Sequence, residues 1–258
     1  MIIKNYVILK VINNISKKDR MKQFIFLFIF IFFILWILNR YLFRYIDYFE
    51  NQSDRKWVVL LTTCVAPAVY GNGKIDEQKR NKEINERKEL YSKQIQRWLN
   101  ETPYSIYVVE SSGYDFPDIQ HDRLKIISFQ LNEKLPSSSQ YEARSILHAL
   151  DEMKEEDDID YVLKVTGRYF LPGIEKSLKN ISSDKNSFLQ IHRKEGWQNS
   201  EYFGLSKDNL YQLAEETKDI GLMEKILFDF TKDKQIEHIG PFSNNIARGG
   251  DGIVLKDL

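Results

Sequence analysis

An uninterrupted apolar run near the N-terminus limits what this chain can fold into more than any other feature. Residues 24–38 read FIFLFIFIFFILWIL, without a charge, a glycine or a proline. Such a helix is typical of a membrane span, although fifteen residues at about 1.5 Å each cover only part of a hydrocarbon core of about 30 Å. We therefore expect the span to recruit residues from Met21 to Phe43, with residues 24–43 as the anchor, and to suit the thin membranes of the early secretory pathway.

A cleaved signal peptide or a buried core helix could also account for this run. No small-residue cleavage site follows Leu38, and so dense a run of aromatic and aliphatic side chains is atypical of a soluble domain. Basic residues dominate before the run, which by the positive-inside rule leaves residues 1–23 as a cytosolic tail. The sequence thus predicts a single-pass type II membrane protein with a retained signal-anchor and a C-terminal portion in the lumen of the ER or Golgi.

The rest of the chain has the composition of one globular domain behind a short stem. Residues 44–56 are polar and aromatic without clear periodicity, so we assign them to the stem and residues 57–258 to the domain. The 37 basic and 37 acidic residues balance, which disfavours a nucleic-acid partner. Cys64 is the only cysteine in the sequence, which excludes an internal disulfide and a cysteine-based zinc site. Three N-x-S/T sequons fall in the translocated part, as in a glycoprotein: Asn51, Asn100 and Asn180.

Alternating strand-like and helix-like segments predict an α/β domain. Strands are expected where apolar and β-branched residues run together, at 57–63, 105–110, 124–129, 161–165, 188–192 and 201–205. Helices are expected at 76–100, from Ser139 with Glu142 at capping-box spacing, from Pro172, and at 222–230. This order favours an open sheet flanked by helices. Ligands of such sheets bind beyond the carboxyl ends of the strands, so the residues that end each strand are the informative ones.

Four segments that end or follow these strands occur in a recognisable order: LLTTCVAP, IYVVESSG, SSSQYEARSILHAL and DYVLKVTGRYFLPGIEKSL. From Trp57 to Leu178 they resemble the nucleotide-sugar-binding half of GT-A-type glycosyltransferases, and a Lys-x-Thr-Gly-Arg-Tyr segment like KVTGRY occurs in viral and microbial members. The resemblance implies a GT-A-like open mixed sheet, preceded here by one transmembrane helix, and transfer of a sugar from a nucleotide-sugar donor to a hydroxyl of a glycan or protein. Because they end the strands, we assign these residues to donor binding: Thr62, Thr63, Glu110, Ser111, Lys164, Thr166, Gly167 and Arg168. The Glu110 carboxylate could bond ribose or base groups, with a helix cap or a surface role as the alternative.

The metal motif of this family is missing from its expected place. Two aspartates around one residue would fall at residues 166–168, where the sequence has TGR. We therefore expect no metal ligands there, and we assign neutralisation of the leaving diphosphate to Arg168, with Lys164 as a second candidate. Both side chains could instead pair with the acidic run at 151–160. The DID at residues 158–160 has the aspartate spacing, but it precedes its strand and so belongs to the wrong end of the sheet.

Three residues are candidates for contact with the acceptor. Glu224 lies where many GT-A enzymes place the carboxylate that deprotonates the acceptor hydroxyl, although it also fits a helix surface. Trp197 and Tyr202 flank a polar loop and are suited to stacking on an acceptor sugar, with core packing as the alternative.

A glycine-rich loop near the C-terminus is a candidate for contact with the diphosphate. Arg248, Gly249 and Gly250 could fold over this group, since glycines let backbone amides face an anion, and a plain turn is the alternative. His192 and His238 are isolated histidines that could serve as a base or a phosphate contact, or satisfy a local hydrogen bond.

Two other functions stay open for this sequence. A catalytically inert, membrane-tethered binding or scaffold protein on a GT-A-like fold would also lack the metal aspartates. A sulfotransferase would need a phosphate-binding loop after the first strand, which TTCVAPAVYGNGK fits poorly. Nucleotide binding separates the enzyme from the scaffold.

Overall fold

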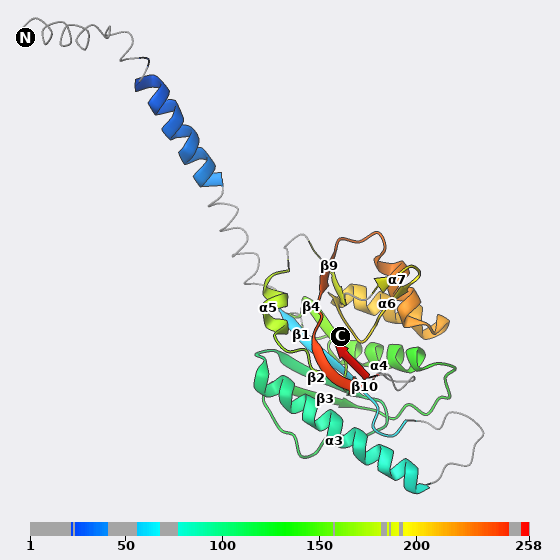
Figure 1. The fold of residues 1–258 in the computed structure, drawn as a ribbon. Coiled ribbons are helices and arrows are strands. Elements are labelled where there is room, and N and C mark those ends of the chain that lie inside the picture. The colour runs from blue at the N-terminus through cyan, green and yellow to red at the C-terminus, as the bar shows by residue number, and fades with distance from the viewer. Residues whose placement is uncertain are drawn as a thin grey trace, which may run out of the picture. The chain divides into compact units, whose positions relative to one another are not determined.

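The computed structural model describes residues 22, 24–40, 56–67, 77–156, 158–181, 185, 187–190, 193–247 and 254–257. The chain forms two units, Met1–Ser53 and Asp54–Leu258 (Figure 1). Apart from Lys22 and Lys56, the predicted tail and stem lie outside the described residues, as do residues 41–43 of the predicted anchor.

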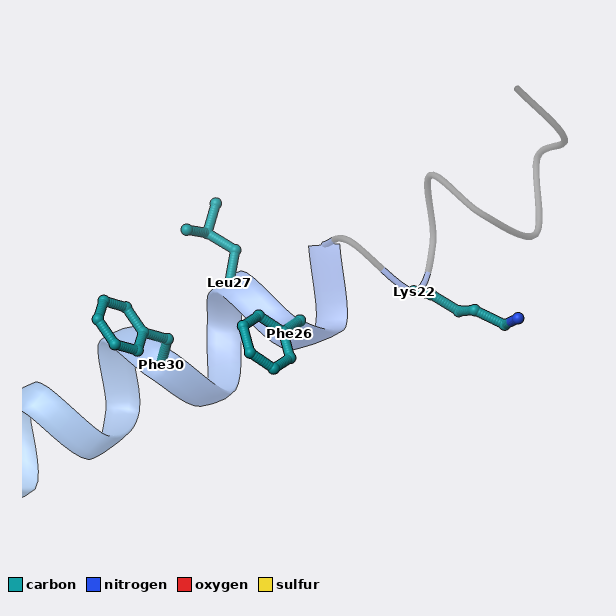
Figure 2. Close-up of a pocket in the computed structure, with 4 residues that line it drawn as sticks. All are labelled: Lys22, Phe26, Leu27 and Phe30. Atoms are coloured by element: carbon teal, nitrogen blue, oxygen red, sulfur yellow. The ribbon is translucent and has the colours of Figure 1, made fainter. Parts of the chain in front are cut away.

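The first unit contains the apolar run as a helix over residues 24–40. Its large apolar side chains from Phe24 to Trp36 are 40% to 77% exposed. Figure 2 shows the start of this helix, where Lys22, Phe26, Leu27 and Phe30 line a surface hollow of about 620 Å³. Within the described ranges, no helix is both long and apolar enough to cross a membrane.

The second unit is built around one mixed sheet of seven strands. These are β1 Trp57–Thr63, β2 Ser105–Glu110, β3 Leu124–Ser128, β4 Tyr161–Thr166, β5 Ser187–Gln190, β8 Tyr202–Ser206 and β9 Ile236–Ile239, in the spatial order β3-β2-β1-β4-β8-β5-β9 (Figure 1). The first four are parallel, β8 runs antiparallel between β4 and β5, and β9 is parallel to β5. Two antiparallel pairs lie outside this sheet: β6 Arg193–Lys194 with β7 Trp197–Gln198, and β10 Ser243–Ala247 with β11 Val254–Asp257.

Helices cover both faces of this sheet. One face carries α3 Glu77–Glu101 and α5 Ile174–Lys179, and the other carries α4 Ser138–Glu152, α6 Lys207–Ile220 and α7 Met223–Thr231 (Figure 1). The apolar run of β1 serves both faces, because alternate side chains of a strand point in opposite directions. Val59 joins the core with Trp98 of α3, and Leu60 joins the core with Ile146 of α4. The unit is a mixed α/β fold whose mostly parallel sheet is flanked by helices, consistent with the expected GT-A-like fold.

The N-cap of helix α4 lies two residues before the predicted one. Ser137 is its N-cap, and the Ser137 hydroxyl accepts a hydrogen bond from the backbone N–H of Gln140 at 3.2 Å. The predicted start at Ser139, with Glu142 closing a capping box, is therefore wrong. The Glu142 carboxylate contacts residues of β1 and β4 instead.

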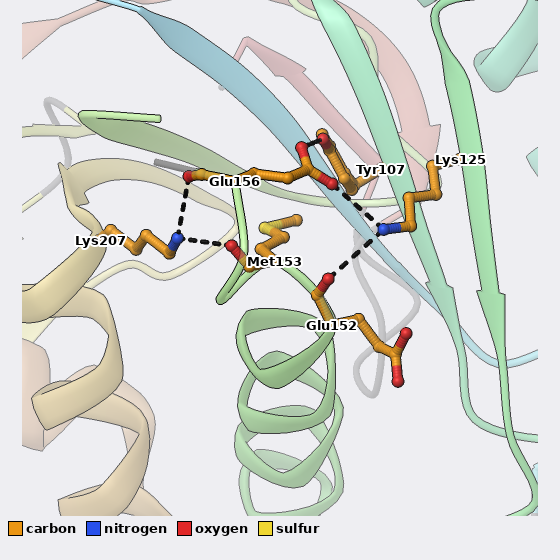
Figure 3. A network of polar contacts seen from close by, with 6 residues as sticks. All are labelled: Tyr107, Lys125, Glu152, Met153, Glu156 and Lys207. Carbon is orange, nitrogen blue, oxygen red and sulfur yellow. Dashed lines mark hydrogen bonds and ion pairs between the residues drawn. The ribbon is translucent and has the colours of Figure 1, made fainter. Parts of the chain in front are cut away.

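The opposite end of α4 is fixed by two lysines from neighbouring elements (Figure 3). Lys125 of β3 and Lys207 of α6 donate to carbonyl oxygens at this end, at 3.3 Å and 2.5 Å respectively. These carbonyls lack partners within the helix, and the partial negative charge there favours cations. Glu156 pairs with Lys125 and accepts a hydrogen bond from the Tyr107 hydroxyl. The helix is thus held firmly at the end remote from Glu142.

Candidate functional site

Three parallel neighbours, β1, β2 and β4, end at one edge of the sheet, which we call the carboxyl edge. Thr63 is paired in register with Glu110, and Thr62 is paired with Thr166. Residues more than forty positions apart in the sequence therefore lie side by side there. The backbone N–H of Gly167 continues this contact by donating to Thr62 O at 2.9 Å.

The β2 side of the carboxyl edge is closed by Glu110, whose side chain is fully buried. Oε1 accepts hydrogen bonds from Val65 N at 2.7 Å and from the Ser112 hydroxyl at 2.6 Å. Oε2 accepts from the backbone N–H groups of Ser112 and Tyr114, both at 2.8 Å. Four bonds from its own chain fill the acceptor capacity of this carboxylate. Glu110 thus joins the loop after β1 to the loop after β2.

Thr63 and Ser111 also direct their polar atoms inward. The Thr63 hydroxyl donates to Val109 O at 3.1 Å, and Ser111 donates from both its backbone N–H and its hydroxyl to Thr63 O, at 3.2 Å and 3.4 Å. Both residues are buried. They fix the distance between the ends of β1 and β2.

The β4 side of the carboxyl edge contains a buried cation, Lys164, which has no exposed surface. Its ammonium lies 2.6 Å from Glu142 Oε1 and donates to Ser200 O at 2.8 Å and to Thr166 Oγ1 at 3.3 Å. A buried ammonium is stable only beside a counter-charge with its protons satisfied, and these three oxygens meet that need. The carboxylate that pairs with Lys164 is Glu142, which lies outside the acidic run at 151–160.

Glu224 belongs to the same hydrogen-bonded network. It lies half-buried in the first turn of α7, and its Oε1 accepts from the Ser200 hydroxyl at 3.0 Å. Ser200 in turn accepts from Lys164 through its carbonyl oxygen. On the other side of Lys164, the Thr62 hydroxyl donates to Glu142 Oε1 at 2.7 Å. The predicted residues Thr62, Lys164, Thr166 and Glu224 are thereby connected through Glu142 and Ser200, two residues that sequence reasoning missed.

Arg168 differs from Lys164 in having spare hydrogen-bonding capacity. It is half-buried, and its guanidinium carbon lies 5.9 Å from the centre of the Tyr169 ring. No carboxylate of the described residues forms an ion pair with Arg168. The alternative role, pairing with the acidic run at 151–160, is therefore not supported by any contact among these residues. The preceding Gly167 is required by space, since a Cβ there would come within 2.4 Å of Thr63 Cγ2 and 3.0 Å of Thr62 O.

The two aromatic candidates for acceptor binding have different surroundings. Trp197 is half-exposed on the β6–β7 hairpin, with the Lys194 ammonium 5.8 Å from the centre of its ring. Tyr202 is fully buried in β8, and its hydroxyl donates to Ile239 O at 2.8 Å. Burial, aided by the nearby Glu201 charge, raises the pKa of Tyr202. Tyr202 is therefore a core residue, and stacking on a sugar is excluded for it in this conformation.

The residues at the end of β4 include neither of the two aspartates of the expected metal motif. Thr166 and Arg168 stand where the two aspartates of the expected motif would be, and the Glu142 carboxylate is paired with Lys164. In the described part of the chain, no group of three or more His, Cys, Asp or Glu side chains could hold an ion. Asp158 and Asp160 lie before β4, at the opposite edge of the sheet, where both contact Lys56.

The remaining candidates lie on a strand three places from β4 in the sheet or outside the described residues. His238 is exposed on β9. His192 and the loop residues Arg248, Gly249 and Gly250 lie outside the part of the chain that the structure describes, so their predicted roles stay predictions.

No protein-family model matches the sequence, and no curated protein matches it. Among solved structures, the chain is similar to a candidate nucleotide-diphospho-sugar transferase from Desulfovibrio desulfuricans G20. The sequence identity is 10% and the TM-score is 0.48, over 72% of this chain and 80% of that chain. At this level of likeness, the residues of the carboxyl edge have to be interpreted from their own contacts.

Proposed function

We propose that this protein is a membrane-anchored glycosyltransferase that moves a sugar from a nucleotide-sugar donor to a hydroxyl of a glycan or protein, without the usual pair of metal-binding aspartates. One observation carries the proposal. Arg168, which no described carboxylate neutralises, and Glu224, a half-buried carboxylate in the Lys164 network, belong to the same carboxyl edge of a mostly parallel sheet. Arg168 can bind an anion and Glu224 can accept a proton. At such an edge these two groups suit the transfer of a sugar from a nucleotide diphosphate.

The donor would lie across the ends of β1, β2 and β4. We assign the diphosphate to Arg168, because its planar guanidinium can bind two phosphate oxygens at once and has no competing carboxylate among the described residues. Lys164 is fully buried and its protons are already used, so it supports the site from below. Thr62, Thr63 and Ser111 are buried beneath the predicted nucleotide side, with their hydroxyls already donating within the protein. A direct contact of Glu110 would require one of its four bonds to be replaced.

The transfer step needs a base and a stabilised leaving group. The acceptor hydroxyl oxygen forms a bond to the anomeric carbon while the bond from that carbon to the phosphate oxygen breaks. The hydroxyl proton passes to Glu224, and the nucleotide leaves with the electron pair, its developing charge neutralised by Arg168. The half-exposed Trp197 ring is suited to stacking on the acceptor sugar.

Membrane anchoring by residues 24–43 is part of the same proposal. A helix that exposes an unbroken series of large apolar side chains is unstable in water and favours lipid. The domain would then lie in the lumen of the ER or Golgi, with the N-terminus in the cytosol. Resistance to extraction by alkaline carbonate, together with glycosidase-sensitive mobility, would support this orientation, and full extraction would contradict it.

A ligand screen tests the enzymatic proposal against the inert scaffold. The full chain in detergent is heated with UDP, GDP and CMP and with UDP-glucose, GDP-mannose and CMP-sialic acid, each in EDTA and in manganese. Stabilisation by one nucleotide family in EDTA is expected, because binding to the native state raises the melting temperature. Stabilisation that needs manganese contradicts metal-independent binding, and no stabilisation under any condition favours the scaffold.

A further inference from the structure

Glu142 is held by only one of its two carboxylate oxygens. Oε1 accepts from the Thr62 hydroxyl at 2.7 Å and lies 2.6 Å from the Lys164 ammonium. Oε2 accepts no hydrogen bond within the described part of the chain, and the side chain is 20% exposed. An ionised carboxylate can accept at both oxygens, so Glu142 keeps an open acceptor at Oε2.

The position of Glu142 within the network suggests what this acceptor meets. Through Thr62 it touches the end of β1, on the side proposed for the nucleotide. Through Lys164 and Ser200 it is connected to Glu224, the proposed base beside the acceptor hydroxyl. The group that lies between a nucleotide and an acceptor during transfer is the sugar being transferred.

We propose that Glu142 recognises the transferred sugar by accepting a hydrogen bond from one of its hydroxyl groups at Oε2, with Lys164 as the positioning residue that holds Oε1. This inference rests on the proposed glycosyltransferase function and adds to it the residue that selects the sugar. A site built around a carboxylate acceptor discriminates strongly against a sugar that lacks the hydroxyl, because the carboxylate is then left without its partner.

The competing role for Glu142 is to neutralise Lys164 and nothing more. That role alone would make Glu142 important for folding and irrelevant to the ligand. Two variants separate the two roles. Glu142→Gln keeps an oxygen for Thr62 and Lys164 but places an amide N–H₂ group where Oε2 was. The double variant Lys164→Met, Glu142→Met removes both charges and fills the space with apolar side chains, a change that buried ion pairs often tolerate.

The experiment is a calorimetric titration of the full chain in detergent with a matched pair of ligands: UDP-glucose with UDP, GDP-mannose with GDP, or CMP-sialic acid with CMP. We expect both variants to bind the nucleotide sugar at least about tenfold more weakly than the wild type, as for a lost bond to a charged acceptor. In Glu142→Gln, which keeps Lys164, binding of the parent nucleotide should weaken much less than binding of the nucleotide sugar. Glu133→Gln is the matched control, because Glu133 is an exposed carboxylate 3.9 Å from Arg144 and outside the network.

Each outcome decides the matter. If either variant binds the nucleotide sugar as the wild type does, or if Glu142→Gln loses the nucleotide and the nucleotide sugar equally, the inference is overturned while the proposed function stands. If the wild type binds neither ligand of any pair, the proposed function and the inference fall together. Should both variants fail to fold, monodeoxy analogues of the bound nucleotide sugar test the wild type directly. One of them must bind at least about tenfold more weakly than the parent, and equal affinity for all of them overturns the inference.

Discussion

The β2 side and the β4 side of the carboxyl edge both have a carboxylate, but the two carboxylates have different roles. Each has a carboxylate beside the end of β1, but Glu110 accepts four hydrogen bonds from its own chain, whereas Glu142 leaves one oxygen open. Each strand end also has polar residues that the sequence marks as candidates for a ligand. An acidic residue at a strand end is therefore informative only through the hydrogen-bonding capacity that it has left.

The two cations of the β4 side differ in the same way, in how much of their hydrogen-bonding capacity the protein already uses. Lys164 has no exposed surface and bonds to three oxygens of the protein. Arg168, four residues later, is half-buried and has no ion-pair partner among the described residues. We therefore expect Glu110 and Lys164 to contribute mainly to stability, and Arg168 and Glu142 mainly to binding.

Glu110→Ala should give the largest loss of stability, about 3 to 5 kcal/mol. The change leaves one buried and two half-buried backbone N–H groups without their acceptor, and each costs up to about 1 to 3 kcal/mol in a way that is not fully additive. Urea unfolding followed by circular dichroism measures the effect, with Glu133→Ala as the exposed control. A loss below about 1 kcal/mol would show that the β2 side is less closed than its contacts indicate.

Gly167→Ala should destabilise the protein by about 1 to 3 kcal/mol, because the new methyl group overlaps Thr63 and presses on the backbone of Thr62. It should also weaken nucleotide binding by separating β4 from β1. Gly196→Ala is the comparison, since nothing lies within 4 Å of the added Cβ and only its positive φ of 71° opposes the change. Equal losses for the two variants would argue against a tight junction at the carboxyl edge.

Arg168→Gln should change stability by less than about 0.5 kcal/mol, because the residue is half-exposed and its guanidinium forms no ion pair with a described carboxylate. Turnover of the donor should nevertheless fall by about 100-fold to 1,000-fold, as for the loss of one group that stabilises a leaving anion. Steady-state assays of nucleotide release measure this, and Arg168→Lys should recover part of the rate. Unfolding of the variant would indicate a structural role for Arg168. Unchanged turnover would exclude its role in stabilising the leaving group.

Cys64 reports on the closed side without disturbing it. Burial raises the pKa of its thiol, and the charge of Glu110 acts in the same direction. The thiolate is the reactive form, so carbamidomethylation by iodoacetamide should be slow at pH 8 relative to a model peptide and should rise only at more alkaline pH. The reaction should be faster in Glu110→Gln, as followed by mass spectrometry of the single cysteine. A wild-type rate equal to that of the peptide would indicate that this side is open.

The sequence predicts the sheet well where local patterns decide it. β1, β2 and β4 are buried on both faces, so their continuous apolar runs were enough to locate them, and the predicted helix at 222–230 is confirmed as α7 Met223–Thr231. Helix α6 was not predicted. The start of α4 was misplaced because three serines in succession, Ser137 to Ser139, can each serve as an N-cap, and only the bond to Gln140 decides among them.

The site could be predicted only in part, because its connections are long-range. Thr62, Lys164 and Arg168 were found from their places at strand ends. Glu142 and Ser200 were missed, since the bond from Thr62 to Glu142 spans 80 positions and the bond from Lys164 to Ser200 spans 36. The sequence did contain an indication of Glu142, because a lysine in a buried strand needs a counter-charge, such as a carboxylate on a covering helix.

The central claim is that Arg168 binds the diphosphate of a nucleotide sugar at the carboxyl edge without a metal. Calorimetric titration in EDTA, with the nucleotide sugar that stabilises the full chain in the ligand screen, tests it most directly in the wild type and in Arg168→Gln. We expect the wild type to bind and the variant to bind at least about tenfold more weakly, as for the loss of a charge-assisted bond. Equal affinities, or binding that appears only when manganese is restored, would contradict it.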